Sequence, residues 1–96
     1  SRHVLLPGLV NTHHHTFQTM TRALRGAQDA ELFGWLQTLY PLWQRLTPDH
    51  VRAAALTACG KLLLSGCTTT ADHLYVYPNG VALEDTIEAA KAIGGE

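Results

Sequence analysis

The sequence is poor in charge, and neither sign dominates. Of its 96 residues 16% are charged, and 7 Lys and Arg stand against 8 Asp and Glu, for a formal net charge of −1. This balance gives no electrostatic reason to expect nucleic acid or a membrane surface as a partner. No apolar run approaches the ~20 residues of a membrane-spanning helix, and residues 1–6 are too short an apolar stretch for a secretory signal.

Cysteine is also scarce, with two residues, Cys59 and Cys67. Two cysteines among apolar neighbours form no disulfide framework and suit a reducing compartment, so we expect a cytoplasmic protein. Hydrophobic residues make up 46% of the chain, which is the composition of a globular domain rather than a disordered segment.

Expected strands alternate with expected helices along the chain, which predicts a parallel α/β sheet. Residues 9–12 form the first strand, an apolar run of the kind buried in parallel sheets, and the threonine-rich residues 67–72 form the second. Residues 75–80 are a loop that contains the turn Pro78-Asn79-Gly80.

Four segments have apolar residues at helical spacing. Thr47-Pro48-Asp49 is a helix start with a hydroxyl cap, and that helix ends at Ser65-Gly66. The last helix, closed by Gly94-Gly95, has an apolar face formed by Leu83, Ile87 and Ala90. The other two expected helices are residues 16–25, stopped by Gly26, and residues 32–40, stopped by Pro41.

Three histidines, His13, His14 and His15, lie where the first expected strand ends. Side chains alternate between the faces of a strand, so His13 and His15 point to one side and His14 points to the other, into the wall. Two imidazoles on one side can bind the same metal ion at ~2.0–2.1 Å. Such histidines also occur in solvated loops, so the spacing alone leaves both interpretations open.

The residues around this cluster carry a wider resemblance. The run Pro-Gly-Leu-Val-Asn-Thr-His-His-His, residues 7–15, resembles the motif that closes the first barrel strand in the amidohydrolase superfamily of metal-dependent hydrolases. This resemblance implies a (β/α)₈ barrel of the TIM type. It also implies that His13 and His15 bind one divalent metal ion, for which we expect zinc, at the carboxyl-terminal mouth of the barrel.

Downstream segments narrow the resemblance to one branch. Residues 29–46 resemble the helical insertion of the aminohydrolases that deaminate purines and related azines. Residues 11–15 and 65–73 are most similar to the members that act on 8-oxoguanine, and the likeness covers nearly the whole chain. It implies hydrolytic deamination of a purine-like base, in which a metal-bound hydroxide attacks the ring carbon that carries the amine.

Three residues are candidates for contact with the substrate: Gln18, Trp43 and His73. Gln18 resembles the glutamine that contacts the base in guanine deaminase-like members, and its amide offers both a donor and an acceptor. Trp43 stands where nucleoside-deaminating members carry an acid, which favours a free base or an azine ring. Each residue also has a structural interpretation: an exposed helix residue, a core anchor and a hydrogen-bonded histidine, respectively.

A complete barrel takes ~250 residues, so we interpret residues 1–96 as a partial hydrolase barrel domain with two strand-helix units. Residues 1–6 would be the end of a preceding β segment. The resemblance places two further histidines, a proton-transferring acid and a last-strand aspartate later in the parent protein. We therefore expect no catalytic residue here and no activity from this piece alone.

Two alternatives to an 8-oxoguanine-type deaminase stay open. One is a guanine or s-triazine hydrolase of the same superfamily, and the other is a non-catalytic metal-binding module, if the natural chain ends here. In the enzyme interpretation the partner is a small heterocyclic substrate. A homo-oligomeric state of the parent is compatible with the resemblance.

Overall fold

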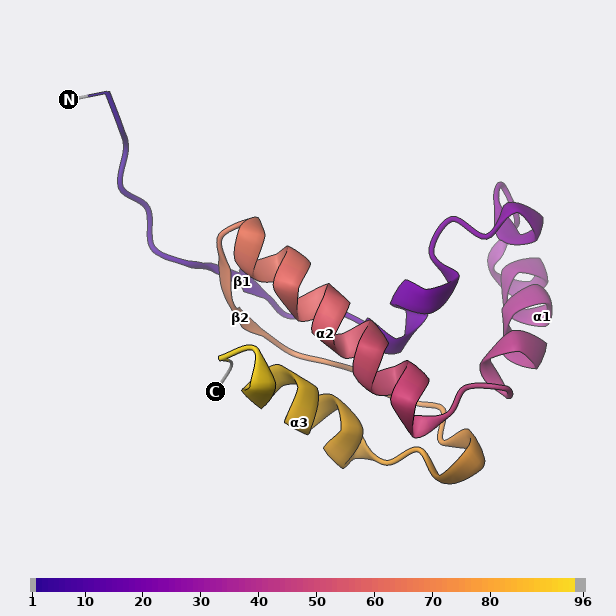
Figure 1. Ribbon diagram of the computed structural model, residues 1–96. Coiled ribbons are helices and arrows are strands. Elements are labelled where there is room, and N and C mark those ends of the chain that lie inside the picture. Colours follow the sequence, from indigo (N-terminus) through magenta and orange to yellow (C-terminus); the bar gives the residue numbers. More distant parts are fainter. Residues whose placement is uncertain (1, 95–96) are drawn as a thin grey trace.

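The computed structural model describes residues 2–94. Over these residues the elements follow one another as β1 (Leu9–Asn11), η1 (Thr16–Thr21), η2 (Arg25–Ala27), α1 (Leu32–Trp43), α2 (Pro48–Leu64), β2 (Cys67–Thr70), η3 (Pro78–Gly80) and α3 (Leu83–Ala92), where η marks a short 3₁₀ helix (Figure 1). None of the helices in residues 2–94 is long and apolar enough to cross a membrane.

β1 and β2 form a parallel pair in which Asn11 lies opposite Thr70. The pairing continues past the strands, because the Ala71 N–H donates to the Asn11 carbonyl at 2.9 Å and the His73 N–H donates to the His14 carbonyl at 2.8 Å. The segments that follow the two strands are therefore held side by side, which confirms the predicted parallel arrangement at the position where a site was expected.

The chain makes a close approach to β2 just before β1 begins. A Cβ atom on Gly8 would lie 2.0 Å from Oγ1 and 2.8 Å from Cβ of Thr68. Thr68 is the residue that the register of β2 skips between Cys67 and Thr69. Because rotating the Thr68 side chain cannot move its own Cβ, the pairing requires glycine at this position.

α2 starts at the predicted cap and packs beside the sheet. The His50 N–H donates to Thr47 Oγ1 at 3.4 Å, and the Thr47 N–H donates to His50 Nδ1 at 3.1 Å. Small side chains line the buried face of α2, which contacts α3, η1 and β2. α2 and α3 lie side by side (Figure 1), and an ion pair of 2.7 Å between Arg52 on α2 and Asp85 on α3 ties them together.

The hydrophobic core lies where side chains of η1, the end of α1 and the start of α2 meet. Phe17 and Trp43 are fully buried there, with ring centroids 5.1 Å apart in an edge-to-face arrangement. Leu39 and Val51 complete the centre of this core. It fixes η1, and with it the residues that follow the histidine cluster.

The prediction that Pro41 ends its helix was wrong, because α1 continues through Pro41 to Trp43. Proline removes one N–H from the ladder and disfavours a helical conformation in the residue before it. The last turn still forms, since the Gln44 N–H donates to the Tyr40 carbonyl at 3.0 Å. Burial of Trp43 stabilises this turn, and that is a tertiary effect the local sequence does not show.

The predicted helix over residues 16–25 is also wrong, because the chain forms the short η1 and η2 instead. Ala23 has φ 56°, which breaks any continuous helix between them. Three threonines in this stretch, Thr16, Thr19 and Thr21, lower its helix propensity because they are β-branched. Thr21 Oγ1 donates to the Gln18 carbonyl at 3.2 Å and thereby stabilises the tighter turn.

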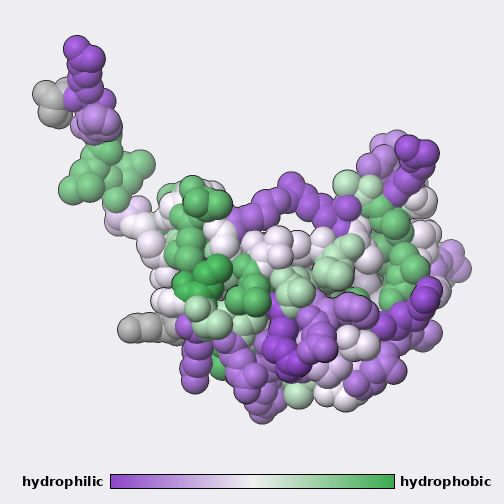
Figure 2. Space-filling model, in the orientation of Figure 1, coloured by the Kyte–Doolittle hydropathy of each residue, from purple (hydrophilic) through white to green (hydrophobic). Residues whose placement is uncertain are grey.

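Two predicted apolar faces are more exposed than expected. Val10 in β1 is 65% exposed, and Leu83 and Ile87 on α3 are 46% and 43% exposed. Asp85 and Ala89 instead form the buried side of α3. Figure 2 shows apolar surface gathered near the strands and the end of α2, and again over α1. The helices of residues 2–94 leave these surfaces uncovered.

The close approach at Gly8 yields a test of the sheet. In the full-length parent, Gly8→Ala should lower the free energy of unfolding by about 2 kcal/mol, because the new methyl group overpacks against Thr68. Gly34→Ala is the matched control, since no atom lies within 4 Å of its added Cβ, and a helical alanine should stabilise by up to about 1 kcal/mol. Denaturant unfolding measures both, and equal effects would contradict the register.

Candidate metal and substrate site

His13 and His15 converge at the end of β1. Their Nε2 atoms lie 3.0 Å apart, and the two rings meet edge to face with centroids 4.9 Å apart. Two nitrogen ligands at ~2.0–2.1 Å from a tetrahedral metal are roughly 3.3 Å from each other. The pair therefore has nearly the separation that one metal ion requires, as the alternation of side chains predicted.

The hydrogen bonds of His15 determine which nitrogen is free. Nδ1 of His15 lies 2.8 Å from the carbonyl oxygen of His73. A carbonyl only accepts, so Nδ1 carries the ring proton, and Nε2 of the neutral ring keeps its lone pair. This lone pair points at Nε2 of His13, where either a proton or a cation between the two nitrogens would satisfy both. The donor set fits a divalent metal.

The pair has no third protein ligand among residues 2–94, which hold no cluster of three His, Cys, Asp or Glu side chains suited to a metal. The His73 ring is close, but its Nε2 lies 3.3 Å from the Thr12 carbonyl. His14 Nδ1 is buried without a hydrogen-bond partner in the described part of the chain, and His14 borders the same cavity as His13 and His15. A complete site requires further ligands from elsewhere in the parent.

Gln18 lies beside the pair and is oriented by a residue that the sequence analysis missed. Its Nε2 donates to the hydroxyl of Tyr75 at 2.8 Å. The Tyr75 ring stands edge-on to His15 and Phe17, with centroids 5.2 and 5.1 Å away. The sequence signal that could have identified Tyr75 is its position after β2, because residues that follow neighbouring parallel strands meet at the same edge of the sheet.

Tyr75 stays neutral at ordinary pH. Burial raises the pKa of its hydroxyl, against a smaller lowering by the bond from Gln18. The neutral hydroxyl can accept from the amide of Gln18 and still donate its own proton. Gln18 and Tyr75 thus form a polar rim next to the histidine pair.

The third candidate for substrate contact, Trp43, lies in the core. Its ring is fully buried, and its Nε1–H donates to Thr21 Oγ1 at 3.1 Å. The structure corresponds to the core-anchor interpretation of this residue. Trp35, by contrast, lines a cavity of about 600 Å³ that also borders His13, His15 and Gln18.

The barrel-type arrangement and the paired histidines define a class of protein. A family model described as "Amidohydrolase family" matches residues 4–95, and the chain belongs to this family. Its two strand-helix units are the first part of a TIM-type barrel.

Curated and solved relatives agree with this assignment. Over 93 residues the chain is 55% identical to the 8-oxoguanine deaminase of Pseudomonas aeruginosa. This match covers 97% of this chain and 20% of that protein. The chain is 40% identical over 92 residues to a 5-methylthioadenosine/S-adenosylhomocysteine deaminase of Syntrophobacter fumaroxidans, covering 95% and 19%.

Among solved structures, the atrazine chlorohydrolase TrzN of Arthrobacter aurescens TC1, complexed with zinc, superposes with a TM-score of 0.86 at 31% identity. The likeness covers 95% of this chain and 22% of that one. The chain thus spans about a fifth of the length of the relatives it matches.

Because the two Nε2 atoms converge, we expect metal binding to depend on both His13 and His15. In the full-length parent, His13→Ala or His15→Ala should each weaken metal binding by more than the roughly 10–100-fold that loss of an outer partner costs. Metal content after dialysis against a chelator measures this effect. His3→Ala, on the exposed arm before β1, is the control and should keep its metal. Full metal content in either pair variant would contradict the site.

Proposed function

We propose that the full-length parent is a metal-dependent aminohydrolase that hydrolytically deaminates a purine-like free base, 8-oxoguanine or a close relative. The observation that carries this proposal is the convergence of His13 and His15 Nε2 at the carboxyl end of β1, beside the polar rim of Gln18 and Tyr75. Identity of 55% to a deaminase of 8-oxoguanine supports the substrate.

A divalent metal at the histidine pair, for which we propose one zinc ion, would supply Lewis acidity and an activated water near neutral pH. In the proposed reaction, water adds to the ring carbon that carries the exocyclic amine, the C–N bond breaks, and ammonia leaves. His13 and His15 hold the metal in this account, and Gln18 hydrogen-bonds the edge of the ring. Zinc in the related atrazine chlorohydrolase supports the choice of metal.

The proton-transferring acid belongs to another part of the parent in this proposal. Asp72 follows β2 beside the pair, but Thr16 donates to both of its oxygens. A carboxylate that accepts two hydrogen bonds within the fold is poorly placed to shuttle protons. For this reason residues 2–94 are proposed to supply metal ligands and ring contacts, and no acid-base group.

A second candidate is hydrolysis of an s-triazine, which the likeness to atrazine chlorohydrolase favours. Both candidates share the histidine pair and its single metal ion, and they differ in the ring that Gln18 contacts. We further propose a cytoplasmic location, because Cys59 and Cys67 are both free and buried, as suits a reducing compartment.

Substrate comparison on the zinc-loaded, full-length parent tests this proposal. Ammonia release should be fastest with 8-oxoguanine, slower with guanine and isocytosine, and slowest with an aminotriazine. A preference for the triazine would favour the second candidate. No release of ammonia from any of these rings would contradict an aminohydrolase.

The same assay examines the ring contact. Gln18→Leu should lower kcat/KM for the preferred base by roughly 10–100-fold, because a ring donor or acceptor is left unpaired. Gln37→Leu, at an exposed position on α1, is the matched control and should leave kcat/KM unchanged. Equal values for the two variants would remove Gln18 from the binding site.

A further inference from the structure

The residues that follow β2 form hydrogen bonds with the residues that follow β1. Asp72 contacts Thr16, and the next residue, His73, contacts His15. The His73 N–H also donates to the His14 carbonyl at 2.8 Å, which continues the strand pairing to this point. Adjacent residues of one segment therefore bind adjacent residues of the other.

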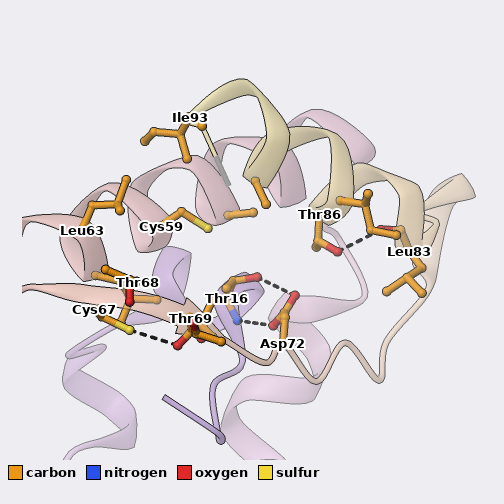
Figure 3. Close-up of a pocket in the computed structure, with 16 residues that line it drawn as sticks. Thr16, Cys59, Leu63, Cys67, Thr68, Thr69, Asp72, Leu83, Thr86 and Ile93 are labelled. Atoms are coloured by element: carbon orange, nitrogen blue, oxygen red, sulfur yellow. Dashed lines mark hydrogen bonds between the residues drawn. The ribbon is translucent and has the colours of Figure 1, made fainter. Parts of the chain in front are cut away.

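Asp72 uses its whole carboxylate for this contact. Oδ1 accepts from the Thr16 N–H at 2.9 Å, and Oδ2 accepts from the Thr16 hydroxyl at 2.8 Å (Figure 3). Thr16 is only 2% exposed, so removal of the carboxylate leaves two buried donors of Thr16 without their partner. Burial raises the pKa of the Cys59 thiol, and the negative charge of Asp72 raises it further.

The contact acts on a single peptide unit. The N–H of Thr16 belongs to the peptide bond that begins at the carbonyl of His15, so Asp72 fixes the backbone from which the His15 ring projects. His73 then fixes the ring itself, because its carbonyl lies 2.8 Å from His15 Nδ1. The position of that carbonyl depends in turn on where Asp72 is held.

We propose that Asp72 is a positioning residue for the metal ligand His15, acting through Thr16. The proposal rests on the metal site proposed above and goes beyond it, because Asp72 touches neither metal nor substrate. Removing the carboxylate lets the His15 peptide rotate, so that His15 Nε2 no longer points at His13 Nε2. Outer groups that orient a ligand in this way commonly affect metal affinity by roughly 10–100-fold.

Asp72→Asn in the full-length parent is the first test. Asparagine keeps the size of the side chain but removes its charge. The Thr16 N–H bond then becomes a weaker neutral one, and the Thr16 hydroxyl must accept from the new NH₂ group instead of donating. Zinc affinity, measured by competition with a chromophoric chelator, should fall by roughly 10–100-fold, and the visible spectrum of the Co²⁺-loaded protein should shift. Thr70→Val, two residues earlier on β2, is the control and should change neither quantity.

Variants of Thr16 give a second route that does not depend on Asp72→Asn folding. Thr16→Val removes the hydroxyl bond and should weaken zinc binding, whereas Thr16→Ser keeps that bond and should retain near-normal affinity. If Asp72 acts through Thr16, the double variant Asp72→Asn/Thr16→Val should lose less affinity than the product of the two single losses.

Two results would overturn the inference. One is unchanged zinc affinity and an unchanged Co²⁺ spectrum in Asp72→Asn together with a lower unfolding temperature of the metal-free protein, which would make Asp72 a structural residue only. In that case the metal site itself stands. Zinc binding to the unmodified parent that survives His13→Ala and His15→Ala would instead overturn the proposed function and this inference together.

Discussion

The parallel pairing of β1 with β2, extended beyond the strands, is the constraint on which the site depends. Backbone bonds from Ala71 to Asn11 and from His73 to His14 keep the two chain segments in register after regular strand structure has ended. Side chains and carbonyls after β2 can then reach those after β1. Without this pairing, the His13 and His15 rings would stand at the end of a three-residue strand with nothing to fix their orientation.

The uncovered apolar surfaces follow from the same architecture. A groove between β2 and α3 is lined by Leu63, Leu83, Ile87 and Ile93 (Figure 3). In a TIM-type barrel each strand pairs with neighbours on both sides and each helix packs over the sheet, so such a groove is interior surface in the whole protein. The relatives, about five times as long as this chain, have the residues to cover it.

Local sequence patterns predicted the parts of the fold that depend on local physics. The cap at Thr47, the turn at Pro78-Asn79-Gly80 and the two strands all follow from residue preferences within a few positions. Pro41 was misjudged because a single local rule was weighed without the burial of Trp43. The stretch after His15 was misjudged because helical spacing of apolar residues does not distinguish an α-helix from two 3₁₀ turns.

The site was predictable only to the level of the histidine pair. Alternation along a strand places His13 and His15 on one side, and this needs no tertiary information. Tyr75 and Asp72, by contrast, act across separations of 57 and 56 residues. Such contacts depend on the register of the sheet, which a single sequence indicates only in outline.

The most direct test of the account is a crystal structure of the full-length, zinc-loaded parent with anomalous data collected at the zinc edge. The account predicts one anomalous peak at ~2.0–2.1 Å from Nε2 of both His13 and His15, with Nδ1 of His15 still bonded to the His73 carbonyl. A peak that contacts neither ring, or that contacts His15 through Nδ1, would contradict it.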